Sequence, residues 1–482
     1  MHYAIRNMTP IRLILEVFTY ALTLWLGLYL MARNFANLRL RYAGLGSVAY
    51  ALTLAGDLLV AYLPSRSPPE GATQLWLLLA RLHGPLLFLP ALFWVRTMIE
   101  LLPETHPWRE RLRQGWLYGL LPVSLLFYLL GAGTSLIVDG TTENTQVGWA
   151  YAIFAMVVLL PLLGGLALVG QIYQAAEPKK PLGLLLAATL FFSLATGLLL
   201  FPFNWLSRTA LLLAVGGDFV MLGFTIALLD AFEEGETLRP DFFRSLESSF
   251  FFVLLFGGLV AQTMALSTGV SFSMLRLLLF IIATAIITQI FADPIQNILD
   301  RFAFASSPKL QEARTELRVE ASILPRIDDA LDLDSLDEAE WKRLTRRALS
   351  NMGDLPRLAT SPLARLPLVY ARLSQKGQQD DTLERAAELK RLLTESIIRL
   401  KPPDKGDFGT SKEWRHYNAL YFPYVVGLKP YSRRAIYDNL DSVEKEALEW
   451  FRSQVPNRTL YNWQSAAAKL VAQDLQERSK RF

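Results

Sequence analysis

The sequence predicts an all-α protein, a polytopic membrane helix bundle with a helical cytoplasmic C-terminal region. Three observations support this fold class. Hydrophobic residues make up 52% of the 482 residues, and the mean hydropathy is +0.27, which is more apolar than a soluble protein of this size. The excess is confined to about the first 290 residues, whereas the remainder is polar. Apolar runs of spanning length repeat through the first part and are separated by short loops.

A membrane-spanning helix needs about 20 mostly apolar residues. Nine runs of the sequence meet this requirement, and the loops between them are short because lipid cannot satisfy irregular backbone. The first seven runs are assigned to a membrane domain, residues 1–233, and the last two to a membrane hairpin with its exit helix, residues 234–305. The predicted spans are 11–31, 42–63, 75–98, 115–136, 148–173, 182–203, 208–230, 248–267 and 273–292.

The basic residues of the short loops predict the orientation, because Lys and Arg concentrate on the cytoplasmic side. Every second loop is basic, whereas the loop VDGTTENTQ between the fourth and fifth spans contains no Lys or Arg. With nine spans, we expect the N-terminus outside and everything after residue 293 in the cytoplasm, in a bacterial inner membrane. The basic loops contain Arg33, Arg39 and Arg41; Arg109, Arg111 and Arg113; Lys179 and Lys180; and Arg239 and Arg244.

Five ionisable residues lie inside the predicted spans, where burial costs free energy and suggests a function. They are Glu16, Asp57, Arg81, His83 and Asp218. All except Asp218 lie toward the outer surface, so one interpretation is a ligand-binding pocket that opens to the outside. The alternative is a structural cluster in which Arg81 pairs with Asp57 or Glu16. A proton or ion path is disfavoured because only Asp218 lies deep in the bundle.

The stretch DPIQNILDRFAF, residues 293–304, marks the exit from the last predicted span. Ile295, Ile298, Leu299 and Phe302 fall on one face of a helix here. Such a face suits pairing with a second copy of the chain, so we expect a homodimer in which a piston or rotation signal passes to the tail. The alternative is an interfacial helix that lies on the lipid headgroups.

The first span and the loop after it, LGLYLMARNFANLRLRYAGLGSVAYALTLAGDLL, resemble the N-terminal seven-helix sensor region of bacterial membrane histidine kinases. The similarity lies in an LGLYLL-type helix end, an Arg-Asn turn and a short basic loop. In that family two further helices end in a segment similar to DPIQNILDRFAF. The resemblance covers about 300 residues and implies a membrane domain that senses a small ligand or a state of the membrane.

Composition and motifs argue against several kinds of chemistry. The chain has no cysteine and only four histidines, none of them paired at the spacing of metal ligands. The only histidine of the tail, His416 in WRHYNALYF, lacks the acidic neighbour expected of a phosphoacceptor. The tail also lacks glycine-rich ATP-binding loops, a Walker lysine motif and a nucleophile elbow. We therefore expect no catalytic residues, no metal and no cofactor.

The tail beyond residue 305 is predicted to be helical in two parts. Residues 306–409 form a cytoplasmic helical module, and Asp337 is the expected N-cap of its first clear helix. The stretch LKPPDKGDFGTS, residues 400–411, is rich in Pro and Gly and is the expected linker to residues 410–482. The predicted helices of the module are 338–351, 363–371 and 382–400.

Residues 410–482 resemble the helix-turn-helix of sigma-factor C-terminal regions and LuxR-like regulators. YVVGLKP matches the entry, and NRTLYNWQSAAAKLVAQDL, with Asn457 as its expected N-cap, matches the recognition helix. An additional helix, VEKEALEWFRSQVP, replaces the tight turn of that family and leaves the docking geometry open. The expected apolar face consists of Leu460, Ala467, Leu470, Val471 and Leu475. The resemblance implies DNA contacts from Arg458, Tyr461, Asn462, Gln464 and Lys469.

Together these features predict a membrane-bound one-component transcription regulator. Its bundle senses a ligand or membrane state, and its DNA-binding tail responds. The alternative is a non-catalytic sensor or scaffold whose tail docks a cytoplasmic protein partner. A transporter is a third hypothesis, disfavoured by the shallow position of most of the charged residues. Neither of the first two hypotheses requires covalent chemistry.

Overall fold

The computed structural model divides the chain into two compact units. One contains Met1–Leu229 and Phe242–Ile298, and the other contains Asp230–Asp241 and Leu299–Phe482. We refer to them as the bundle and the tail. The structure describes residues 10–62, 88–102, 106–134, 138–139, 146–175, 179–201, 206–234, 238–303, 336–377, 381–403, 406, 408–431 and 440–480.

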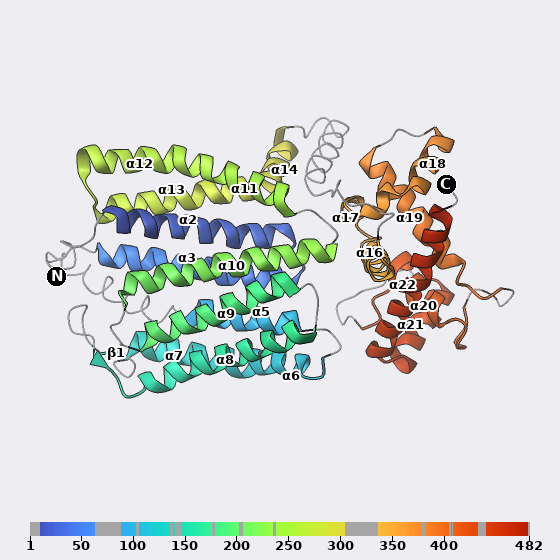
Figure 1. The fold of residues 1–482 in the computed structure, drawn as a ribbon, viewed down its shortest axis with the longest axis horizontal. Helices are drawn as coiled ribbons and strands as arrows, with labels where there is room; N and C mark the ends of the chain where they lie inside the picture. The colour runs from blue at the N-terminus through green and yellow to red at the C-terminus, as the bar shows by residue number, and fades with distance from the viewer. Residues whose placement is uncertain are drawn as a thin grey trace. The chain divides into compact units, whose positions relative to one another are not determined.

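The bundle consists of long helices that run side by side (Figure 1). Its first half contains α2 (Pro10–Arg33), α3 (Leu38–Ala61), α5 (Phe88–Leu101), α6 (Arg109–Gln114), a π-helical turn η2 (Gly115–Leu120) and α7 (Leu121–Gly133). A two-residue antiparallel pair follows, β1 (Val138–Asp139) with β2 (Gln146–Val147). The second half contains α8 (Tyr151–Ala175), α9 (Lys179–Leu200), α10 (Arg208–Glu234), α11 (Leu238–Phe252), η3 (Val253–Gly257), α12 (Gly258–Thr263), η4 (Met264–Thr268), α13 (Phe272–Ile290) and α14 (Ala292–Ala303).

Eight helical segments of the described residues are long and apolar enough to cross a membrane. The predicted all-helical architecture is confirmed, and eight of the nine predicted spans have such a segment among the described residues. The expected span at 75–98 is described only from Phe88 onward, where α5 forms its second half. The span predicted at 248–267 begins earlier, at Phe242, because the polar start of α11 continues into the apolar η3 without a break.

Glycine brings α2 and α3 into backbone contact and lets α10 approach side chains of α2 closely. A Cβ atom at Gly27 of α2 would lie 2.7 Å from the carbonyl oxygen of Gly44 in α3, and one at Gly44 would lie 2.6 Å from that of Gly27. On α10, a Cβ at Gly216 would lie 2.3 Å from the Thr19 side chain, and one at Gly223 would meet Leu26. Small residues permit this close approach of membrane helices, so α2, α3 and α10 form the centre of the bundle.

The apolar side chains that remain exposed on the outer helices of the bundle are suited to contact lipid. On the segment from α11 to η4, Phe251, Leu254 and Leu266 are more than half exposed. This segment packs mainly on α13, and α13 packs on α2. A soluble protein would not leave so many large apolar side chains in water, which agrees with a membrane location.

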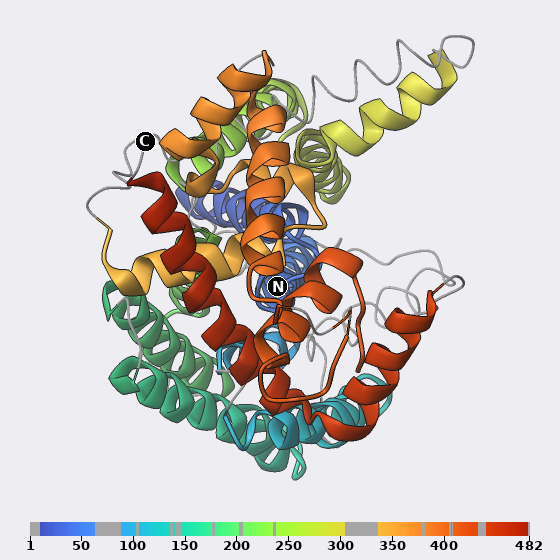
Figure 2. The same ribbon diagram turned by 90° about the vertical axis from the view of Figure 1, so that its right-hand side faces the viewer.

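The chain changes direction where α13 ends. Phe291 leaves the helical conformation, with φ −103° and ψ 26°, and α14 begins at the next residue. Figure 2, which views the spans nearly end-on, shows α14 running outward from the end of α13 rather than continuing its axis. Ile295, Ile298 and Leu299 are exposed on it, at 36%, 55% and 59%. The side chain of Phe302, expected on the same face, lies outside the described residues.

The regular secondary structure in the described part of the tail is entirely helical. Its elements are α16 (Glu338–Ser350), α17 (Leu355–Ala359), η7 (Pro362–Arg365), α18 (Pro367–Lys376), α19 (Thr382–Ile398), α20 (Arg415–Leu420), η8 (Tyr421–Val426), α21 (Ser442–Gln454) and α22 (Asn457–Ser479). Asp337 caps α16 through a capping box with Glu340, as predicted. The helix predicted at 363–371 starts later, at Pro367, because proline is accommodated only in the first turn of a helix.

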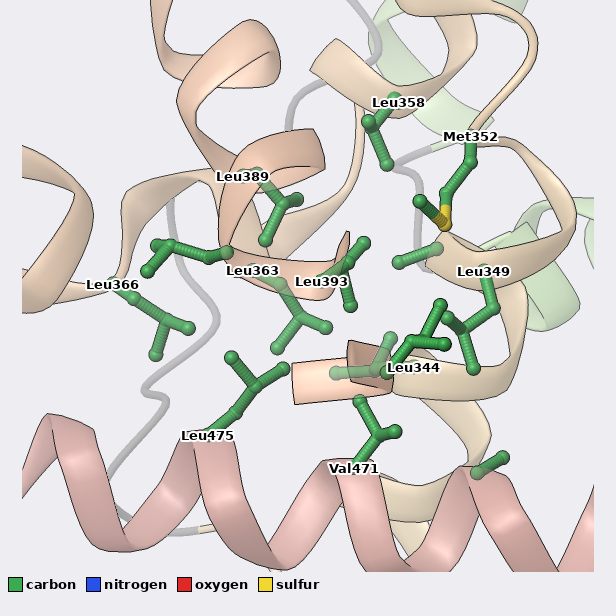
Figure 3. Packing of buried hydrophobic residues seen from close by; sticks show 14 of the residues in the cluster. Leu344, Leu349, Met352, Leu358, Leu363, Leu366, Leu389, Leu393, Val471 and Leu475 are labelled. Carbon is green, nitrogen blue, oxygen red and sulfur yellow. The ribbon is translucent and has the colours of Figure 1, made fainter. Parts of the chain in front are cut away.

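One hydrophobic core connects α22 with the helices that precede the predicted linker. Val471 and Leu475 of α22 point toward Leu344, Leu363 and Leu393 (Figure 3). The boundary expected between residues 409 and 410 therefore runs through a shared core.

Two predictions for α22 are wrong. Leu470 is 39% exposed, because its neighbour Val471 points into the core instead. Pro456, not Asn457, is the N-cap, since its extended backbone (ψ 144°) ends the turn before the helix.

Candidate functional site

Three of the five ionisable residues predicted inside the spans interact electrostatically with Tyr50 of α3. The Tyr50 hydroxyl donates a hydrogen bond to the carbonyl oxygen of Leu212 in α10. Electrostatic interactions link Tyr50 to Asp57, Glu16 and Asp218. Three residues that were chosen from the sequence as candidate ligand contacts, on three different helices, therefore share one region of the bundle.

Two of these carboxylates form ion pairs. Glu16 Oε1 lies 2.9 Å from Arg12 Nε one helical turn earlier, a spacing at which opposite charges attract along a helix. Asp57 Oδ1 lies 3.2 Å from Arg208 Nη2 at the start of α10. One of the two interpretations of the sequence, the structural cluster, pairs Arg81 with Asp57 or Glu16. Arg81 and His83 lie outside the described residues, and the structure supplies Arg12 and Arg208 as the pairing cations.

Asp218 differs from the other two carboxylates. It is 6% exposed, and no group in the described parts of the chain donates a hydrogen bond to its buried Oδ2 atom. Buried carboxylate oxygens nearly always have a partner, and an ionisable residue inside a membrane is costly unless it serves a purpose. Asp218 is therefore the strongest candidate in the bundle for a residue whose state changes during function.

Aromatic rings surround the helix turn that carries Asp218. Phe219 stacks on Tyr50 with ring centroids 5.3 Å apart and contacts Trp94 edge-on at 5.1 Å. Trp94 in turn stacks on Phe192 at 4.0 Å. These rings join α3, α5, α9 and α10. A rotation of α10 at Asp218 would therefore shift the aromatic contacts that connect α10 with α3, α5 and α9.

The nearest crevice is narrow and apolar. It leaves about 20 Å³ for the centres of water-sized molecules, which is room for about one water. A small-molecule pocket usually occupies several hundred cubic ångströms. This crevice therefore has no room for a small-molecule ligand. The lining residues are Tyr50, Phe88, Pro90, Phe154, Val158, Phe192, Thr196, Leu199, Leu200 and Val215.

The expected DNA-contact residues of α22 are partly engaged within the tail. The Tyr461 ring lies 4.3 Å below the guanidinium of Arg346. Gln464 Nε2 donates a hydrogen bond to the carbonyl oxygen of Ala419, and Lys469 Nζ lies 2.6 Å from Glu338 Oε1. Asn462 is exposed, and the side chain of Arg458 lies outside the described residues. The side of α22 predicted to face DNA thus makes three contacts with α16 and α20.

A network of charged side chains, which the sequence did not indicate, holds α22 and α18 to α19. Arg478 Nη2 lies 2.9 Å from Glu395 Oε2, and Arg372 donates two hydrogen bonds to the same carboxylate. Asp474 accepts hydrogen bonds from Ser396 and Arg399. These residues lie 75 or more positions apart along the chain, except for the pair on α18 and α19, so spacing gives no signal of their contact.

A single buried carboxylate lies at one end of this network. Glu388 is fully buried, and its Oε2 accepts hydrogen bonds from Lys376 at 2.5 Å and Arg391 at 2.7 Å. Burial raises the pKa of Glu388. The hydrogen bonds from Lys376 and Arg391 lower it by more than burial raises it, so the pKa lies below its usual value. The hydrogen bond from Arg372 likewise lowers the pKa of Glu395. Both carboxylates are therefore ionised at neutral pH.

Metal-site geometry and similarity to known proteins add no further assignment. Within the described ranges, no three His, Asp or Glu side chains are placed to hold a metal ion. The chain matches no protein-family model, no curated protein and no solved structure. The functional argument therefore rests on the geometry of the bundle and of the tail.

Proposed function

We propose that the protein is a membrane-bound signal transducer of the bacterial inner membrane, in which the bundle senses a ligand or a membrane state and the tail reports it by docking a cytoplasmic protein. The orientation follows from the basic loops, with the N-terminus outside. The observation that carries the proposal is Asp218, a buried carboxylate whose Oδ2 accepts no hydrogen bond from the described residues. A bundle state that supplies this partner would be favoured over the present one.

The route from the bundle to the tail runs through α14. It is the connection between the last span and the tail, and its apolar residues Ile298 and Leu299 are exposed. A second copy of the chain that paired through this face would join the two bundles at the point where the signal leaves the membrane. The engagement of Tyr461, Gln464 and Lys469 within the tail favours a protein over DNA as the docking partner.

Coupling between Asp218 and the tail can be tested by hydrogen–deuterium exchange of the full-length protein in lipid nanodiscs. Asp218→Asn keeps the shape of the side chain and removes its charge, so it should shift the bundle between its two states. We expect amide exchange in α16 or α19 to change on the order of tenfold, the effect of about 1.4 kcal/mol of differential stability. The readout is the exchange of tail peptides, far in sequence from the substitution.

Glu110→Gln is the matched control, because Glu110 is 69% exposed on α6 of the same bundle. It removes a carboxylate that contacts Arg113 and Gln114 rather than Asp218 or Tyr50, so tail exchange should not change. If Asp218→Asn leaves the tail peptides as they are in the wild type, the bundle does not signal through this residue and the proposal fails.

DNA is the second candidate partner, and one feature of the tail favours it. Helices α21 and α22 are joined by only two residues, Val455 and Pro456, as in a helix-turn-helix, where the second helix enters the major groove. Asn462 and Lys469 are exposed on α22. The additional helix noted in the sequence would then be the first helix of the motif rather than an interruption of it.

A salt titration of duplex binding by the full-length protein separates the two candidates. If α22 contacts phosphates, the logarithm of the affinity should fall linearly with the logarithm of the salt concentration, by about 0.9 per contact. Lys469→Ala should then reduce this slope by about 1, whereas Lys445→Ala on the exposed side of α21 should leave it unchanged. An affinity that does not depend on salt, or is absent for all duplexes, rejects DNA as the partner.

A further inference from the structure

A buried carboxylate at the end of α5 is surrounded by arginines. Glu100 is 1% exposed, and its carboxylate lies 2.6 Å from Arg96, 3.1 Å from Arg113 and 3.2 Å from Arg109. Arg39 at the start of α3 donates a hydrogen bond from Nε to the carbonyl oxygen of Glu100. We call these four arginines and Glu100 the basic cluster. It joins α3, α5 and α6 at one end of the bundle.

The arginines of the basic cluster have two different roles. Arg96 is held in place, with its guanidinium 5.0 Å from the ring of Tyr42 and 5.1 Å from that of Trp116. Its side chain is 8% exposed, so it serves to neutralise Glu100. The side chains of Arg109 and Arg113 are more accessible, at 16% and 31%. Glu100 thus positions two guanidiniums at the surface rather than neutralising them.

Positive charge exceeds negative charge in the basic cluster. Three guanidiniums contact one buried carboxylate, and Glu110, which contacts Arg113 at 3.4 Å, is largely exposed to solvent. Arg41 and Arg111 add two more positive charges on the same helices. Such an excess is costly in a partly buried site unless an anion balances it. An anionic group against the accessible edge of Arg113 would reduce this cost.

Aromatic residues place the basic cluster at the depth of the lipid headgroups. Trp108, immediately before α6, and Tyr118, in η2, are exposed at 56% and 77%. Phe35, 61% exposed, lies 5.3 Å from the guanidinium of Arg41. Exposed aromatic side chains concentrate where a membrane protein crosses the interface between acyl chains and water. Lipid-facing residues such as Leu125 and Leu129 follow in α7.

We propose that the basic cluster binds the phosphate group of an anionic phospholipid, with Arg109 and Arg113 as the contacting residues and Glu100 and Arg96 as the residues that position them. A guanidinium donates paired hydrogen bonds to a phosphodiester more effectively than an ammonium group does, and the site uses only arginine. The basic loops assign this end of the bundle to the cytoplasmic leaflet, where basic pockets between helices bind anionic headgroups. The assignment is independent of any sensory role of Asp218.

The test compares full-length protein in nanodiscs of phosphatidylcholine with and without phosphatidylglycerol. Retention of each lipid by the solubilised protein is measured by native mass spectrometry. The wild type should retain phosphatidylglycerol preferentially, and Arg109→Gln with Arg113→Gln should reduce this preference by about thirtyfold. Arg276→Gln is the control, because Arg276 is exposed at the start of α13, away from the basic cluster, and the preference should persist.

Three outcomes overturn the proposal. The double variant retains the wild-type preference, the control loses it equally, or inorganic phosphate displaces the lipid, which would show a site for free anions. If the double variant does not fold, Arg113→Gln alone is measured, since Glu100 then still contacts Arg96 and Arg109. A smaller loss of preference, about fivefold, is expected from this single variant, and an unchanged preference rejects the assignment.

Discussion

Replacing Gly27 by isoleucine should separate α2 from α3 and destabilise the bundle by about 3 kcal/mol, at the upper end of the usual cost of overpacking. Even a Cβ atom at this position would lie 2.7 Å from the backbone oxygen of Gly44 and 2.8 Å from a Val48 methyl group. Backbone cannot move aside as a flexible side chain can. The helices must therefore move apart and lose the packing on which their association in lipid depends.

Gly217 on α10 is the matched control, because no atom lies within 4 Å of a Cβ placed there. Gly217→Ile points an apolar side chain toward the outside of the bundle, and its effect should stay within about 0.5 kcal/mol. The measurement is the unfolding of the purified protein in mixed micelles with increasing sodium dodecyl sulfate. Equal destabilisation by the two variants would show that α2 and α3 do not meet at Gly27.

The same contact shows why hydropathy predicts the spans but not their packing. A run of about 20 apolar residues is sufficient to form a membrane helix, so the ends of α2, α8 and α10 fall close to their predicted positions. The choice of neighbours depends on Gly27, Gly44 and their counterparts on α10, which differ little in hydropathy from other small residues. The sequence alone does not show which glycines face one another.

The sequence predicts only those features of the candidate site that depend on residues close together in the chain. The residues Glu16, Asp57 and Asp218 were recognisable because a charge inside an apolar run is conspicuous. The pairing of Arg12 with Glu16 could also be predicted, because residues four positions apart lie one above the other on a helix. Arg208 was not, because 151 residues separate it from Asp57. The contacts of Tyr461, Gln464 and Lys469 also required the fold, since each partner lies on another helix.

Removing the cations around Glu388 should destabilise the tail more than removing Glu388 itself. Glu388 is fully buried, whereas the side chains of Lys376 and Arg391 are 43% and 49% exposed. Lys376→Met with Arg391→Met leaves Arg372, at 3.5 Å, as the one cation of the described residues that pairs with this buried carboxylate, and should cost about 3 kcal/mol. Glu388→Gln allows both cations to turn into water, so its cost should be about 1 kcal/mol. Hydrogen exchange of α19 amides in the full-length protein measures both values.

Acid should remove the contribution of Glu388 in the wild type. Because the folded pKa lies below the ordinary value of 4.5, the ionised network stabilises the tail fully above that pH and loses this stabilisation as the pH falls through the folded pKa. Glu388→Gln should lack this part of the acid-induced loss, as followed by circular dichroism of the full-length protein across the acid range. If Glu388→Gln proves more damaging than the double cation variant, or keeps the complete acid transition, the tail does not depend on the ion pairs of Glu388.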